Sequence, residues 1–168
     1  MSHSAGGGDG AASSSAPGRR RRPEPTPLQR ALGLLTRREH SRRELLCKLE
    51  QRGVEPEAAA EAVARLAQAG WQDDARFAES LVRNRAASGF GPAYIRAELN
   101  THGLAAELVE TALQGFDGDW AANARRLLER RHPQALQGDR QAQRKAADFL
   151  FRRGFTRDQV SAALASGE

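Results

Sequence analysis

Three segments of the chain share one pattern at a spacing of about fifty residues. They are residues 43–54 (RELLCKLEQRGV), residues 94–104 (YIRAELNTHGL) and residues 145–155 (KAADFLFRRGF). When they are aligned on their glycines, each has an apolar residue four positions before the glycine and another directly after it. Repeats with periods of about 20 to 50 residues are typical of stacked helical units that cannot bury their apolar faces alone. The sequence therefore predicts a tandem array of helical units.

Helix start and stop signals divide the chain into three such units. Ser41 and Glu44 fit the S-x-x-E capping box at the start of one helix, and Gly53 fits the left-handed position after its last turn. Thr156 and Gln159 fit a second capping box in the third repeat. No segment alternates strictly between apolar and polar residues over more than a few positions, which argues against β-strands. We therefore predict an all-α fold, an elongated array of three tandem three-helix repeats.

A tail is expected to precede this array. Residues 1–26 consist mainly of glycine, alanine, serine, proline and arginine, with too few apolar residues to offset the entropy of ordering, so we expect them to be disordered. The arginines from Arg19 to Arg22 are expected to stay solvated, with a transient nucleic-acid contact as the alternative. The three repeats are expected at residues 27–70, 71–116 and 117–168.

Three features of the sequence bear on the compartment. A single cysteine, Cys47, excludes an internal disulfide and is typical of a reducing environment. No run of about 18 apolar residues is present, so no membrane span is expected. The first residues also lack the apolar stretch of a secretory signal. A cytoplasmic location is therefore expected.

Basic side chains are distributed unevenly among the expected helices. The net charge is +5, and nearly all of the 26 basic residues are arginine, a choice that GC-rich coding explains as well as function does. Residues 28–52 hold seven basic and three acidic side chains, and residues 120–153 hold nine and three. Residues 54–70 instead have a net charge of −2. Because this asymmetry recurs, we predict a basic functional face beside an acidic one.

Basic residues near corresponding helix ends form the candidate binding site. Guanidinium groups suit phosphates and carboxylates alike, so nucleic acid and an acidic protein surface both remain open as partners. For some of these residues the helix dipole alone explains the position. The candidate residues are Arg37, Arg38, Arg42, Arg43, Arg83, Arg85, Arg96, Arg130, Arg131, Arg140, Arg144, Lys145, Arg152 and Arg153.

The sequence lacks the patterns expected for catalysis or cofactor binding. His40, His102 and His132 lie near turns without a partner at metal-ligand spacing. Cys47 has no neighbours that mark a nucleophile, and we expect it to pack within the protein. No G-x-x-x-x-G-K-[ST] loop is present. We therefore expect no enzyme activity, no cofactor and no metal.

The two tryptophans, Trp71 and Trp120, both precede expected helix starts. We expect them to cover the apolar core, where large aromatic side chains contribute most of their packing area. Base stacking on their rings is the less favoured alternative.

Three segments resemble the RecX family of regulatory proteins. They are residues 38–45 (REHSRREL), residues 70–78 (GWQDDARFA) and residues 89–103. The last of these opens with GFG, continues with Ile95 and Leu99, and ends at Gly103. The second is similar to the family's Gly-aromatic-x-(Asn/Asp)-Asp-x-x-Phe-Ala segment. The likeness covers about residues 28 to 165 and is strongest in the first two repeats, whereas the tail lies outside the family pattern.

The resemblance implies a regulator of the RecA recombinase and not an enzyme. Members of this family bind the RecA–DNA filament and inhibit strand exchange and ATP hydrolysis in homologous recombination, DNA repair and the SOS response. The expected partner is thus the RecA filament, with weak and salt-dependent DNA contact and a monomeric protein. One alternative is a general single- or double-stranded DNA-binding helical module that acts on RecA only by competition. Another is a protein-only adaptor that binds an acidic helix or tail.

Overall fold

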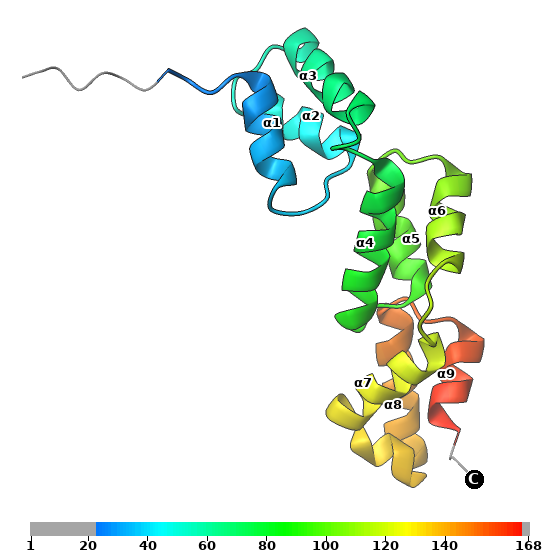
Figure 1. Ribbon diagram of the computed structural model, residues 1–168. Coiled ribbons are helices and arrows are strands. Elements are labelled where there is room, and N and C mark those ends of the chain that lie inside the picture. Colours follow the sequence, from blue (N-terminus) through cyan, green and yellow to red (C-terminus); the bar gives the residue numbers. More distant parts are fainter. Residues whose placement is uncertain (1–22, 166–168) are drawn as a thin grey trace, which may run out of the picture.

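The computed structural model of this chain describes residues 23–165, and these are helices joined by turns, with no β-strand in that range (Figure 1). The first unit contains α1 (Pro27–Leu35), α2 (Arg42–Glu50) and α3 (Pro56–Gln68). The second contains α4 (Asp74–Ala87), α5 (Pro92–Thr101) and α6 (Ala106–Gln114). The third contains α7 (Trp120–Arg131), the 3-10 helix η1 (Pro133–Gln137), α8 (Arg140–Arg152) and α9 (Arg157–Leu164). The predicted all-α fold of three tandem three-helix units is confirmed, while the expectations for residues 1–22 lie outside the described residues.

Side-chain caps begin several helices at the predicted positions. The Thr156 hydroxyl accepts from the Gln159 N–H while the Gln159 side chain accepts from the Thr156 N–H, which confirms that capping box. The Ser41 hydroxyl likewise accepts from the Glu44 N–H at 3.1 Å. The Glu44 carboxylate, however, accepts from the Arg38 guanidinium at 3.0 Å and not from the Ser41 N–H. The predicted hydrogen bond from the Ser41 N–H to Glu44 is therefore absent, and this half of the capping box is wrong. A carboxylate forms a stronger hydrogen bond with a charged guanidinium than with a backbone N–H.

The three repeated glycines end their helices in the left-handed conformation. Gly53, Gly103 and Gly154 have φ angles of 79°, 69° and 85°. Residues with a Cβ atom adopt this region at a cost, so glycine is favoured where a helix must stop and the chain must reverse. The glycines thus set the length of the middle helix in each unit.

Each unit buries its own apolar core. Leu49, Leu99 and Leu150, four positions before the repeated glycines, are all fully buried and belong to three separate clusters. Trp120 packs against the clusters of both the second and the third unit, with its ring centre 4.3 Å from that of Phe116. The expectation that Trp120 covers the core is therefore confirmed.

The second and third units are joined backbone to backbone. α4 packs against α7, and the Gly91 N–H donates to the Arg153 carbonyl at 2.8 Å. The Ala93 N–H donates to the Gly154 carbonyl at 3.0 Å. A Cβ atom at Gly154 would lie 2.3 Å from the Tyr94 nitrogen, so a larger residue there would force the two turns apart. This joint holds the two units in one orientation.

Two residues expected to pack inside the protein are exposed instead. Trp71 is 55% exposed, because the chain leaves α3 in a turn that buries the next side chain, Gln72, and not the indole. Cys47 is exposed on the side of α2 away from the buried Leu45 and Leu49. Both expectations are wrong, since the local pattern did not reveal which side of these segments faces the core.

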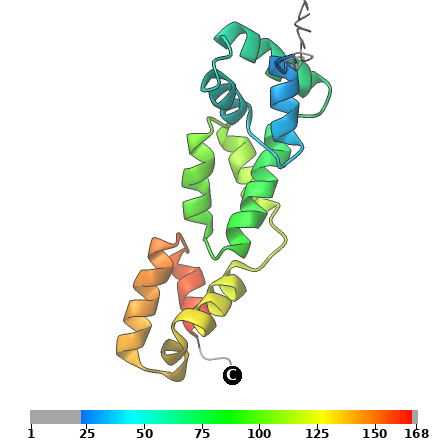
Figure 2. The ribbon, with the colours of Figure 1, turned by 90° about the vertical axis from the view of Figure 1, so that its left-hand side faces the viewer.

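The three units follow one another end to end and form an elongated molecule. Figure 1 shows the first unit turned aside from the line of the other two, and Figure 2 shows the same order in a perpendicular view. Within residues 23–165, none of the helices has the length and apolar character needed to cross a bilayer. The molecule is therefore elongated and bent, and its surface extends over all three units.

Candidate binding surface

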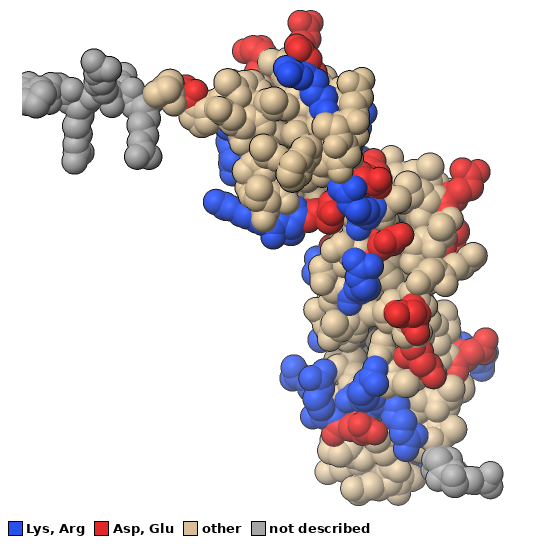
Figure 3. Space-filling model, viewed as in Figure 1, with Lys and Arg blue, Asp and Glu red and all other residues tan. Residues whose placement is uncertain are grey.

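Cationic side chains are concentrated in the first and third units. Residues 27–70 contain eight basic and six acidic side chains, and residues 117–165 contain ten and six. Residues 71–116, the second unit, contain four and six. Figure 3 shows basic side chains at the lower end of the first unit and again over the third unit. The surface thus has two basic ends separated by a net acidic middle.

Two candidate arginines of the second unit are held in ion pairs between helices. The Arg85 guanidinium donates to both carboxylate oxygens of Glu98, at 2.7 and 2.6 Å, and links α4 to α5. Arg96 donates to both oxygens of Glu110, at 2.7 and 3.1 Å, and links α5 to α6. These hydrogen bonds lower the pKa of both carboxyl groups. Their geometry favours a role within the unit over contact with a partner.

The two other arginines of the second unit also lie near carboxylates. Arg83 is 3.9 Å from Glu79, and both side chains are exposed, so this pair is weak. Arg76, which was not a candidate, donates to Glu39 of the first unit at 2.9 Å. All four arginines between residues 71 and 116 therefore have an acidic neighbour.

Six candidate cations of the third unit are exposed and have no carboxylate oxygen within 4.0 Å among residues 23–165. Unpaired guanidinium groups keep all their donors for a partner, and they match the geometry of phosphates and carboxylates. Arg153 differs, because its guanidinium carbon lies 4.6 Å from the centre of the Phe90 ring and its Nη1 donates to the Ser88 carbonyl at 3.3 Å. The six, which lie on α7 and α8, are Arg130, Arg131, Arg140, Arg144, Lys145 and Arg152.

The first unit has a smaller set of the same kind. Arg37, Arg42 and Arg43 are exposed and have no carboxylate oxygen within 4.0 Å in the part of the chain that is described. Arg38 is instead paired with Glu44. Burial raises the pKa of Glu44, but the hydrogen bond from Arg38 and nearby positive charge outweigh it and hold that pKa below its ordinary value. Three of the four candidates here are thus available to a partner.

The joint between the first and second units contains a buried polar contact. The Ser41 hydroxyl is fully buried and accepts from the Glu44 N–H. It also forms a hydrogen bond with the Nδ1 atom of His102, 2.8 Å away. The His102 ring also lies 4.6 Å from the ring of Phe77. One side chain thus caps α2 and ties it to the second unit.

A carboxylate of the second unit caps the same helix from outside. Asp74, in the first turn of α4, accepts from the Arg42 N–H at 2.8 Å. It also accepts from the Gln72 amide at 2.9 Å, and that amide lies 3.4 Å from the His40 carbonyl. The amino ends of α2 and α4 therefore meet at one carboxylate, which the positive ends of both helix dipoles favour. This joint rests on polar side chains, unlike the backbone joint between the second and third units.

His40 makes this joint sensitive to pH. Its ring is buried, its Nδ1 lies 3.0 Å from the Arg38 carbonyl, and burial lowers its pKa. As the pH falls below about 6.5, the unfolded chain therefore takes up this proton more readily than the folded chain does. The free energy of unfolding is expected to fall as the pH drops from 7 toward 5.5.

The variant His40→Gln, measured by urea unfolding at several pH values, should lose most of this dependence, because glutamine keeps a donor for the carbonyl and does not titrate. The pKa values of Glu44, Glu98 and Glu110 are lowered from 4.5, so their contribution is lost only at more acidic pH. A variant that loses as much stability as the wild type between pH 7 and about 5.5 would contradict the assignment.

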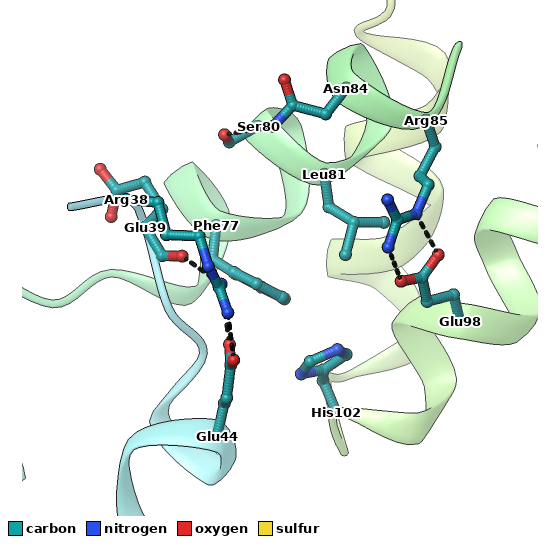
Figure 4. Close-up of a pocket in the computed structure, with 10 residues that line it drawn as sticks. All are labelled: Arg38, Glu39, Glu44, Phe77, Ser80, Leu81, Asn84, Arg85, Glu98 and His102. Atoms are coloured by element: carbon teal, nitrogen blue, oxygen red, sulfur yellow. Dashed lines mark hydrogen bonds and ion pairs between the residues drawn. The ribbon is translucent and has the colours of Figure 1, made fainter. Parts of the chain in front are cut away.

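A cleft of about 370 Å³ lies beside this joint (Figure 4). Phe77 and Leu81 lie between two ion pairs that line it, Arg38 with Glu44 and Arg85 with Glu98. Because these charges are already paired, the cleft has little to offer an ionic ligand. Among the described residues, no group of three or more His, Cys, Asp or Glu side chains is placed to hold a metal ion. The exposed cations are therefore the stronger candidate site.

Comparison with known proteins adds an independent observation. Models of the first, second and third three-helix domains of RecX match residues 28–66, 73–113 and 117–164. The regulatory protein RecX of Stenotrophomonas maltophilia (strain R551-3) is 58% identical over 140 residues, which are 83% of this chain and 86% of that protein. The regulatory protein RecX of Xanthomonas axonopodis pv. citri (strain 306) is 59% identical over the same shares. A crystal structure of RecX from Lactobacillus salivarius has the same fold, with a TM-score of 0.68 at 23% identity over 82% of this chain and 92% of that one.

Proposed function

Because the chain belongs to the RecX family of regulatory proteins, we propose that it binds the RecA–DNA filament and inhibits RecA in homologous recombination and DNA repair. It is a regulatory protein and not an enzyme. The observation that carries the proposed binding mode is the separation of the unpaired candidate cations into two sets, one in the first unit and one in the third, with the carboxylate-paired arginines of the second unit between them. A regulator built in this way holds its target at two places.

The geometry supports contact with more than one RecA subunit. The basic ends belong to the first and third units, and the second unit between them has every arginine near a carboxylate. Two weak contacts on one rigid body strengthen each other only when the partner presents both sites at a matching distance. A filament of identical subunits presents such sites repeatedly. We therefore expect the assembled filament to be bound more tightly than an isolated RecA subunit.

The alternative is a general DNA-binding module that affects RecA by competing for its DNA. The six exposed cations on α7 and α8 favour this alternative too, because arginine without a carboxylate partner suits phosphate. Competition predicts that inhibition follows the affinity for bare DNA. Filament binding predicts inhibition at concentrations at which bare DNA remains free.

The first test measures ATP hydrolysis by RecA on single-stranded DNA. The purified full-length chain is expected to slow this hydrolysis in a concentration-dependent way. The same preparation without RecA should hydrolyse no ATP above the background of a control preparation. An unchanged rate with the chain in excess over RecA would contradict the proposed function.

A further inference from the structure

Flat side chains form a continuous series across the joint between the second and third units. Tyr94 of α5 stacks on Phe90, with ring centres 4.2 Å apart and planes inclined by 22°. The Arg153 guanidinium carbon follows, 4.6 Å from the centre of the Phe90 ring and 5.3 Å from that of Phe149 in α8. The His132 ring lies 4.9 Å beyond, against Phe149. We call these five residues the aromatic–arginine series.

The joint itself does not require the outer end of this series. Backbone hydrogen bonds from Gly91 and Ala93 already connect the two turns, and α4 packs against α7 beside them (Figure 2). Phe90 covers one face of the Tyr94 ring, yet Tyr94 remains 40% exposed. The Tyr94 hydroxyl makes no hydrogen bond within residues 23–165. An exposed ring that ends a stack is a position at which another flat group can be added.

Unpaired cations adjoin the members of the series that belong to the third unit. Arg131 and Arg152 directly adjoin His132 and Arg153 in the sequence, and both are exposed without a carboxylate within 4.0 Å in the described part of the chain. Arg130 lines a cleft of about 360 Å³ with Arg126, Glu129 and Gly89, and Gly89 is the neighbour of Phe90. Positive charge therefore lies near the third-unit part of the series, and cations close to exposed aromatic rings are the combination that proteins use to bind single strands.

We propose that the aromatic–arginine series is a stacking site for the unpaired bases of single-stranded nucleic acid, with Tyr94 receiving the first base. Bases in a duplex are already stacked on their neighbours, so a single strand can place a base on the ring without breaking a pair. A protein partner rich in carboxylates would use the arginines but would gain little from the free ring. The inference extends the proposed function, since a RecA filament is assembled on DNA.

The test compares two probes that carry the same phosphates. One is an oligothymidylate of about 12 nucleotides, and the other is an abasic strand of equal length. The wild-type chain is expected to bind the oligothymidylate about 5- to 150-fold more tightly, which corresponds to one stacked base. Equal affinities for the two strands would overturn the proposal, and this comparison needs no altered protein.

Variants of Tyr94 then locate the site. Tyr94→Ala is expected to remove the preference for the oligothymidylate and to leave both affinities near that of the abasic strand, whereas Tyr94→Phe should retain the preference. Light-induced cross-linking to a strand containing 5-iododeoxyuridine should join the strand to Tyr94 in the wild type. A cross-link found only elsewhere, for example at the exposed Trp71, would overturn the placement. These experiments contain no RecA, so their failure is distinct from a failure of the ATP-hydrolysis test.

Discussion

A chain with Arg42→Glu, Arg43→Glu, Arg144→Glu and Lys145→Glu is expected to lose nearly all inhibition of RecA while it stays folded. The four side chains are exposed, have no carboxylate within 4.0 Å in residues 23–165, and belong to the two basic ends. Each pair of changes alone should weaken inhibition, and the two pairs together should compound, because each end strengthens the contact of the other. If the partner groups are phosphates, each lost contact should reduce the slope of log affinity against log salt by about 0.7 to 0.9.

A matched control separates the effect of the positions of the changed residues from the effect of the change in total charge. Arg52 and Arg65 of the first unit are also exposed and without an ion-pair partner among the described residues, but they lie outside the candidate set. Arg52→Glu with Arg65→Glu changes the net charge as much as Arg42→Glu with Arg43→Glu and should leave inhibition nearly intact. If the four-site variant has unchanged circular dichroism and still inhibits RecA at wild-type concentrations, the basic ends do not form the binding site.

The second large effect concerns stability. Leu150→Ala is expected to lower the free energy of unfolding by about 2 to 5 kcal/mol, because it empties a fully buried position in the core of the third unit. Its neighbour Phe151 is 47% exposed, so Phe151→Ala should cost about 1 kcal/mol or less. Urea unfolding of the two variants measures both values. A cost below about half a kilocalorie per mole for Leu150→Ala would show that the unit does not depend on this repeat position.

The repeat pattern made the fold predictable because its signals are local. A glycine that must adopt a positive φ and an apolar residue one turn earlier describe the end of a buried helix without reference to the rest of the chain. Leu49, Leu99 and Leu150 are fully buried for this reason. The expectation for Trp71 rested only on its place before a helix start, and it failed because a residue in a turn can point either way.

The joints could not be predicted because their contacts are distant in the sequence. Ser41 and His102 are 61 residues apart, and no spacing rule connects them. The stacking of Arg153 on Phe90 joins two different repeats in the same way.

The candidate site was predictable in part. Counting arginines located the basic ends, but the sequence does not reveal which arginines are paired, since a pair such as Arg85 with Glu98 forms between two helices. Nine of the fourteen candidates are exposed without a carboxylate within 4.0 Å in residues 23–165. Of the other five, Arg38, Arg83, Arg85 and Arg96 lie in ion pairs and Arg153 stacks on aromatic rings. Which candidates are paired depends on how the helices pack against one another, and the sequence alone does not show that packing.

The most direct test of filament binding measures the affinity of the full-length chain for three targets over a series of salt concentrations. The targets are RecA assembled on single-stranded DNA, the same DNA without RecA, and RecA without DNA. We predict that the assembled filament is bound most tightly at every salt concentration, because it alone presents repeated sites to both basic ends. Affinity for bare DNA equal to or above that for the filament would contradict filament binding and would favour competition for DNA.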